Sequence, residues 1–93
     1  MELRPLGRSG LLVSRLALGT MTWGRDTDEH EARDQLMAFV EVGGTLVDTA
    51  DVYEKGSSER IGGAAVAASR EHWIVATKVG NAMDPGTKNN GGL

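Results

Sequence analysis

The chain has 93 residues, with ten Lys or Arg against thirteen Asp or Glu, so it can form one small domain with a net charge of −3. This balance provides no basic surface for nucleic acid and no polybasic patch for a membrane. There is no cysteine, which excludes disulfides, thiolate metal sites and a thiol nucleophile, and suits a cytoplasmic protein. The start, MELRPLGRSG, lacks the apolar core of a secretory signal, and no apolar run approaches the ~20 residues of a membrane span.

The N-terminal residues predict a small β-hairpin followed by a strand. Two short apolar runs, MELRPL and LLVSRL, flank the glycine-bounded turn GRSG. Because proline has no amide hydrogen to donate to a sheet, Pro5 places the first run at an edge. The segment 15–19, RLALG, then predicts a strand that stops at Gly19, before the loop TMTWGRDTD.

Residues 28–42 predict an amphipathic helix. Asp28 and Glu31 have the spacing of a capping box, and the pair Gly43–Gly44 supplies the stop. The apolar residues recur on one helical face, at Ala32, Leu36, Phe39, Val40 and Gly43.

A second helix is predicted over about 58–70, with Ser57 or Ser58 as its N-cap. Its apolar stripe is narrow and consists of Ile61, Ala65 and Ala68. The other small residues of this segment permit a close approach to a sheet, while its glycines lower the helix propensity.

Two further segments, 45–48 (TLVD) and 72–78 (HWIVATK), predict buried strands. Strands that alternate with helices form parallel sheets with right-handed crossovers. Gly19, Asp48 and Lys78, at the predicted strand ends, lie 29 and then 30 residues apart. A (β/α)8 barrel of ~250 residues needs about 30 residues per unit. We therefore predict an α/β fold, a hairpin followed by the N-terminal part of a (β/α)8 TIM barrel with its first three strands and two helices.

The carboxyl ends of barrel strands are where such folds place their functional residues. Asp48 and Lys78 end neighbouring strands, about 5 Å apart, and Tyr53 lies on the loop that follows Asp48. A lysine cation stabilises a phenolate and lowers the pKa of a tyrosine from ~10. An aspartate beside the lysine holds it in place and keeps it charged. A tyrosine tuned in this way can protonate the alkoxide that develops when a carbonyl is reduced by hydride transfer.

The segments LGTMTWG, DTADVYEKGSSERIGG and IVATKVG resemble the N-terminal third of the aldo-keto reductases. The branch with bacterial oxidoreductases and potassium-channel β-subunits is the most similar, through its DTAxxYxxGxSExxxG pattern. The resemblance implies a TIM barrel and NADP(H)-dependent interconversion of carbonyls and alcohols, with a small-molecule carbonyl substrate. The preference for NADPH over NADH follows from the resemblance alone.

Residue by residue, the resemblance makes Tyr53 the general acid, Lys78 its pKa-lowering partner and Asp48 the third catalytic member. Gly19, Thr20 and Met21 are similar to the loop that passes the nicotinamide ribose, which Asp48 also contacts. Trp23 stands where family members often place an apolar wall of the substrate pocket. Glu59 and Gly62 fit the pattern in structural roles.

The resemblance also implies parts that these residues do not supply. The fourth catalytic residue of the family is a histidine at the end of the next strand, and neither His30 nor His72 matches that position. The pyrophosphate and adenine sites lie in later strands, beyond Leu93.

Residues 80–93 are expected to form a flexible loop. We expect the 93-residue chain alone to be inactive and poorly folded, and the remainder of the barrel to come from a second chain or a missing segment.

Other interpretations of the same residues remain open at this level. Taken singly, Asp48 and Asp51 suit turns or helix caps, Tyr53 suits a half-buried aromatic, and Lys78 suits a solvated strand end. Trp23 and Trp73 suit packing as well as a pocket. For the whole chain, the alternatives to a reductase are a non-catalytic, cofactor-binding regulatory subunit of the same fold and an inactive truncated fragment.

Overall fold

The computed structural model describes residues 1–83, 86, 88, 91 and 92, and its strands form two sheets. The first is an antiparallel hairpin of β1 (Leu3–Pro5) and β2 (Leu12–Ser14), as predicted. The second is a parallel sheet in the order β3 (Ala17–Gly19), β4 (Leu46–Asp48) and β5 (Ile74–Ala76). The last residues of the three strands, Gly19, Asp48 and Ala76, are in register with one another, so the carboxyl ends of the strands lie at one edge of the sheet.

Helix α1 (Glu29–Glu41) joins β3 to β4 and lies within one residue of its predicted bounds. The Asp28 carboxylate accepts from the Glu31 amide and the Glu31 carboxylate accepts from the Asp28 amide, which completes the predicted capping box. The chain then reverses at Gly43, whose φ of 88° lies in the left-handed region that glycine adopts at low cost.

Helix α2 (Ser57–Val66) joins β4 to β5 and is shorter than the predicted 58–70. After Val66 the chain tightens into 3₁₀ turns over Ala67–His72, with a break at Ser69. The N-cap is Gly56, with a φ of 95° and no side-chain hydrogen bond, so the predicted serine cap is wrong. The reason is that the Ser58 hydroxyl is engaged by the strand ends instead.

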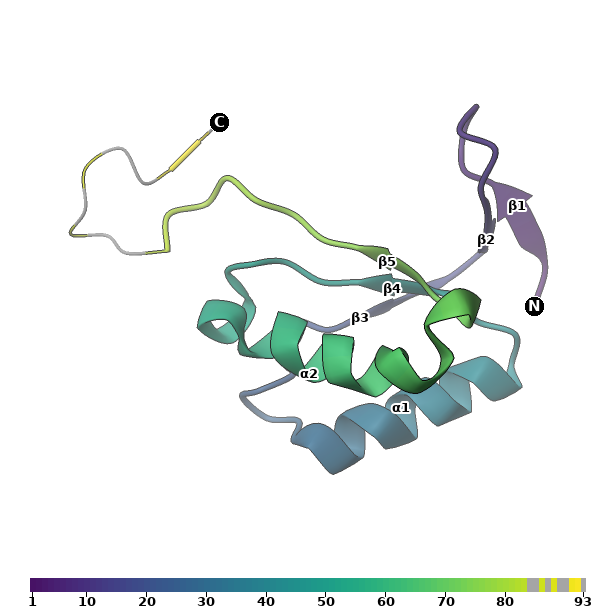
Figure 1. Cartoon of the computed structure of the whole chain (residues 1–93), viewed down its shortest axis with the longest axis horizontal. Helices are drawn as coiled ribbons and strands as arrows, with labels where there is room; N and C mark the ends of the chain where they lie inside the picture. The colour runs from purple at the N-terminus through teal and green to yellow at the C-terminus, as the bar shows by residue number, and fades with distance from the viewer. Residues whose placement is uncertain (84–85, 87, 89–90, 93) are drawn as a thin grey trace.

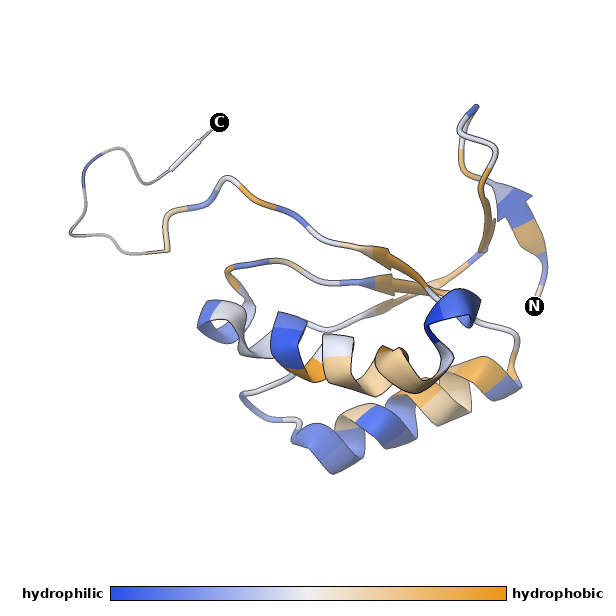
Figure 2. Cartoon of the chain, viewed as in Figure 1, coloured by the Kyte–Doolittle hydropathy of each residue, from blue (hydrophilic) through white to orange (hydrophobic). Residues whose placement is uncertain are grey.

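The two helices lie side by side on one face of the parallel sheet (Figure 1). Successive strand residues point to opposite faces, and Val47 of the central strand points to the helices, where it is 1% exposed. The core around it contains Trp23, Ala32, Leu36, Val66 and Trp73. Figure 2 shows the matching pattern, with apolar residues along the strands of the parallel sheet and polar residues on the first turn of α1.

β5 is one of the two edge strands of the parallel sheet in the described structure. Val75 is in register with buried Val47 but stays 36% exposed, because no helix of the described residues covers β5. The chain after β5 runs away from the helices (Figure 1). Of the loop predicted over 80–93, residues 84–85, 87, 89–90 and 93 lie outside the described residues. In the described part of the chain, no helix has the length and apolar character needed to cross a membrane.

Candidate active site

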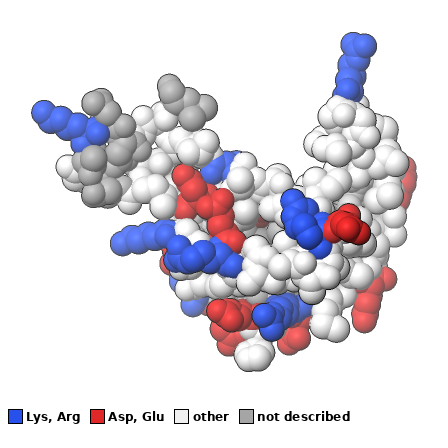
Figure 3. All heavy atoms as spheres, in the orientation of Figure 1, with Lys and Arg blue, Asp and Glu red and all other residues white. Residues whose placement is uncertain are grey.

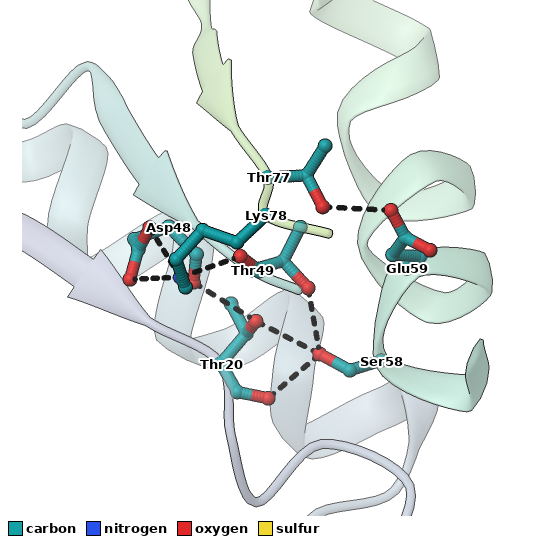
Figure 4. A network of polar contacts seen from close by, with 7 residues as sticks. All are labelled: Thr20, Asp48, Thr49, Ser58, Glu59, Thr77 and Lys78. Carbon is teal, nitrogen blue, oxygen red and sulfur yellow. Dashed lines mark hydrogen bonds and ion pairs between the residues drawn. The ribbon is translucent and has the colours of Figure 1, made fainter. Parts of the chain in front are cut away.

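An aspartate–lysine pair lies at the carboxyl ends of β4 and β5. Lys78 is two residues beyond the end of β5, not at the strand end as predicted, and its side chain reaches back to β4. Its Nζ donates to both carboxylate oxygens of Asp48, at 2.9 and 3.0 Å, and to the carbonyl oxygen of Thr49 at 2.7 Å (Figure 4). The Lys78 side chain is 51% exposed and that of Asp48 is 42% exposed, so a ligand can reach the pair.

The electrostatics of the pair keep the lysine charged. The hydrogen bond to Asp48 raises the pKa of Lys78 above its ordinary value, against the lowering effect of partial burial, and Tyr53 adds to the rise. Over the face of the molecule that Figure 3 shows, positive and negative side chains are interspersed. Within the described residues, no three His, Asp or Glu side chains converge as ligands of a metal ion. The charges of this site are therefore those of the Lys78 ammonium and the Asp48 carboxylate.

Tyr53 lies next to this ammonium. The Lys78 Nζ is 5.1 Å from the centroid of the Tyr53 ring, which is within the range of a cation–π contact. The tyrosine begins a tight turn, Tyr53–Gly56, in which Glu54 and Lys55 have φ values of 49° and 54°. Left-handed backbone is uncommon for residues with side chains and is found at functional sites. This turn leads directly into α2, so the position of Tyr53 depends on where that helix begins.

The loop after β3 reaches the same edge of the sheet. Gly19 is exposed and a side chain at its position would meet no atom of this chain, so a ligand can approach its backbone. Thr20 is fully buried, and both its amide and its hydroxyl donate to the carbonyl oxygen of Asp48. Met21 is 58% exposed. At this edge of the sheet, a ligand can therefore reach the backbone of Gly19, the side chain of Met21 and the carboxylate of Asp48.

Trp23 lies apart from this group. It is 0% exposed, and its Nε1 donates to the side-chain oxygen of Gln35 at 2.8 Å. Its ring packs beneath α2, where a side chain at Gly62 would meet it at 3.7 Å. A fully buried indole offers no surface to a substrate, so the structure places Trp23 in the core and not in a pocket wall. The signal for this was Gly62, a residue without a side chain on the buried face of a helix.

The sequence did not predict that three buried hydroxyls beneath the site bond to one another. Thr20, Thr49 and Ser58 are 0%, 5% and 0% exposed, and they come from the ends of β3 and β4 and the start of α2. Figure 4 shows the three side chains pointing toward one another. The signal for Thr20 and Thr49 is a hydroxyl residue directly after a strand end, and that for Ser58 is a serine in the first turn of a helix; both also suit an ordinary turn or cap.

The fold and this site define a member of one protein family. Residues 15–92 match the model of the aldo/keto reductase family, which is most of the chain. The chain therefore belongs to the aldo/keto reductase family, as its motifs indicated.

Individual relatives agree with this assignment. The chain is 40% identical over 88 residues to the uncharacterized oxidoreductase YqkF of Bacillus subtilis, covering 95% of this chain and 28% of the relative. It is 39% identical over 83 residues to a probable voltage-gated potassium channel subunit beta of Oryza sativa, covering 85% of this chain and 25% of the relative. An aldo-keto reductase from Bacillus halodurans, solved in its holo form, superposes on all of this chain with a TM-score of 0.80 and 41% identity. The superposition covers 30% of that structure, so the chain spans less than a third of these three relatives.

Proposed function

We propose that this chain carries the proton-donor half of a carbonyl reductase site that uses NADP(H). The observation behind the proposal is that one ammonium, on Lys78, holds both oxygens of Asp48 while it lies 5.1 Å from the ring of Tyr53. Taken singly, Asp48 suits a turn or helix cap, Tyr53 a half-buried aromatic and Lys78 a solvated strand end. Together, at one edge of a parallel sheet, they form an acid with its electrostatic support.

The three residues would divide the work by their chemistry. Tyr53 would donate its hydroxyl proton to the carbonyl oxygen of an aldehyde or ketone as negative charge develops there. The Lys78 ammonium would stabilise the phenolate that remains, which is then reprotonated from solvent. Asp48 would keep Lys78 charged and correctly aimed, since the pKa of Lys78 is raised mainly by this contact.

The cofactor would lie over the strand ends. When bound, NADPH supplies the hydride that reduces the carbonyl carbon. The ribose next to the nicotinamide would be held by the open backbone at Gly19, the exposed side chain of Met21 and the carboxylate of Asp48. Buried Thr20 fixes the loop that carries Gly19 and Met21. The family membership and the holo form of the Bacillus halodurans structure support this assignment.

The rest of the barrel would have to come from further sequence. β5 is an unpaired edge in the described structure, and a groove of about 420 Å³ lined by Val75 and α2 residues runs beside it. We propose that further β/α units, on a longer chain or a second one, cover this edge. The 93 residues alone are expected to show no reductase activity.

The direct test completes the barrel. In a chimeric protein, the completed barrel, residues 1–93 are followed by the part of the Bacillus halodurans enzyme that comes after its superposed segment. We expect it to oxidise NADPH when aldehydes are added, and NADH more slowly. The Bacillus halodurans remainder without residues 1–93 is the control and should be inactive. A folded completed barrel with no turnover on any aldehyde or ketone would contradict the proposal.

A second candidate function is a cofactor-binding regulatory subunit. The potassium channel subunit beta of Oryza sativa is 39% identical to this chain, and it retains similarity across the segment that carries the candidate site. Such a subunit would bind NADPH tightly without turning it over. Quenching of protein fluorescence by NADPH, measured together with turnover, separates the two functions.

A further inference from the structure

The first turn of α2 is connected to the ends of β3, β4 and β5. The Ser58 hydroxyl contacts the carbonyl oxygen of Thr20 at 2.7 Å, the hydroxyl of Thr20 at 2.8 Å and the hydroxyl of Thr49 at 3.1 Å. The next residue, Glu59, accepts a hydrogen bond of 2.7 Å from the hydroxyl of Thr77. Figure 4 shows the helix start and the strand ends meeting through these side chains.

The proton on each hydroxyl can be assigned from its partners. Ser58 has a single proton, which it directs to Thr20, so the Thr49 hydroxyl must donate to Ser58. The hydroxyl of Thr20 in turn donates to the carbonyl oxygen of Asp48 at 3.0 Å. Because these groups are buried, losing one partner leaves another group unsatisfied at substantial cost.

Both branches of this network end on the backbone that carries the charged pair. One branch runs from Ser58 through Thr20 to the carbonyl oxygen of Asp48. The other runs from Ser58 to Thr49, whose own carbonyl oxygen accepts from the Lys78 ammonium at 2.7 Å. On the far side, Glu59 holds the residue directly before Lys78. Thus one helical turn fixes the backbone on both sides of the Asp48–Lys78 pair.

We propose that Ser58 and Glu59 form a positioning clamp, which acts through Thr20, Thr49 and Thr77 to hold Asp48 and Lys78 in line with Tyr53. The clamp residues touch neither substrate nor cofactor, and their role rests on the proposed function. A displacement of about 1 Å in a catalytic group can cost about 100-fold in rate. The clamp would therefore act on kcat more than on KM.

The test compares two substitutions of Thr49 in the completed barrel. Thr49→Val keeps the side-chain shape but removes the hydroxyl, and Thr49→Ser keeps the hydroxyl but removes the methyl group. We expect Thr49→Val to lower kcat about tenfold with KM changed by less than about twofold, and Thr49→Ser to retain the wild-type kcat. Thr77→Val and Thr77→Ser repeat the comparison on the β5 side, where the side chain is exposed and folding is not at risk.

The matched control is Thr27→Val. Thr27 is 7% exposed and its hydroxyl is 3.3 Å from that of Thr22. The hydrogen bonds of Thr27 among the described residues go to Thr22 and Gly24 and not to a strand end. It should lower thermal stability while leaving kcat unchanged. If Thr49→Ser loses as much kcat as Thr49→Val, the hydroxyl is not responsible and the clamp is ruled out.

A second readout does not depend on turnover. The Lys78 ammonium is titrated by NMR in the completed barrel, with Lys78→Arg used to assign its signal. The clamp predicts that Thr49→Val moves the pKa of Lys78 down toward its ordinary 10.5, while Thr27→Val leaves it in place. If the wild type is active, and Thr49→Val changes neither the titration of Lys78 nor kcat, the clamp is overturned and the proposed function is not. An inactive wild type overturns the proposed function, and the titration still decides whether the clamp exists.

Discussion

Two buried serines hold the two ends of the parallel sheet, and they do so with different partners. Ser14, at the amino ends of the strands, is 2% exposed and donates to the carbonyl oxygen of Leu16. It accepts from the amides of Thr45 and Leu46 at 3.0 and 3.3 Å, and so ties the hairpin to β4. Ser58, at the carboxyl ends, is 0% exposed and binds the hydroxyls of Thr20 and Thr49.

The difference lies in what is connected to each serine. Every partner of Ser14 is a backbone group of a strand or its flank, or the hydroxyl of Thr45, and none carries charge. The partners of Ser58 lead within one further bond to Asp48 and Lys78. The same buried hydroxyl chemistry thus stabilises the fold at one end and orders a charged pair at the other, as expected for a barrel with its function at the carboxyl ends of its strands.

The largest expected contrast between the two ends comes from removing a positive charge. In the completed barrel, Lys78→Met should lower kcat by about 100-fold or more, because the phenolate of Tyr53 loses its nearest cation. Arg8→Met, in the exposed hairpin turn at the other end, is the matched loss of charge and should leave kcat unchanged. Equal effects of the two variants on kcat would show that position at the strand ends does not matter.

A smaller contrast is expected between the two serines themselves. Ser14→Ala and Ser58→Ala each leave buried groups unsatisfied and should each lower the free energy of unfolding by about 1–3 kcal/mol. Only Ser58→Ala should also lower kcat, by about tenfold. Urea denaturation and steady-state kinetics on the same preparations measure both quantities. A loss of kcat in Ser14→Ala of similar size would remove the distinction drawn between the two ends.

The N-cap of α1 tests whether a substitution lowers kcat simply because it lies near the carboxyl ends of the strands. Asp28 precedes the first turn of α1, and its hydrogen bonds stay within this helix start, in the capping box and to the amide of Ala32. Asp28→Ala should cost about 1 kcal/mol of unfolding free energy, and Asp28→Asn clearly less, because asparagine is also a good N-cap. Neither variant should change kcat. A change in kcat for Asp28→Ala would mean that general loosening of this end, and not the clamp, controls the rate.

The smallest effect concerns pH. The pKa of Lys78 is raised in the folded chain, chiefly by Asp48, from the ordinary 10.5. A raised folded pKa contributes stability that is fully present below the unfolded pKa and is lost as pH rises through the folded pKa. The wild type should therefore lose unfolding free energy relative to Lys78→Met only above about pH 10.5, and by little, because the pair is half exposed. Urea denaturation at a series of pH values checks this, and a loss already near neutral pH would contradict it.

Sequence patterns predicted the architecture because periodicity and capping are local. The hairpin, the bounds of α1, the parallel order of β3, β4 and β5 and the family all follow from such patterns. The role of Ser58 could not be predicted, since a serine before a helix is typical of an N-cap and its partner Thr20 is distant in sequence. Trp23 shows a similar limit, because its place in a polar loop does not show that its ring is buried beneath α2, and Gly62 is the single residue that pointed to this packing. The meeting of Asp48, Tyr53 and Lys78 was predictable, as the register of parallel strands brings their carboxyl ends together.

The most direct test of the central proposal is the single-turnover rate of hydride transfer in the completed barrel. NADPH is bound first, an aldehyde is mixed in, and the loss of NADPH absorbance is followed in the wild type and in Tyr53→Phe. We expect a rapid exponential loss in the wild type and a rate about 10²–10⁴-fold lower in Tyr53→Phe, with NADPH still bound. Equal rates in the two proteins, or tight NADPH binding without oxidation in the wild type, would contradict a proton-donor role for Tyr53.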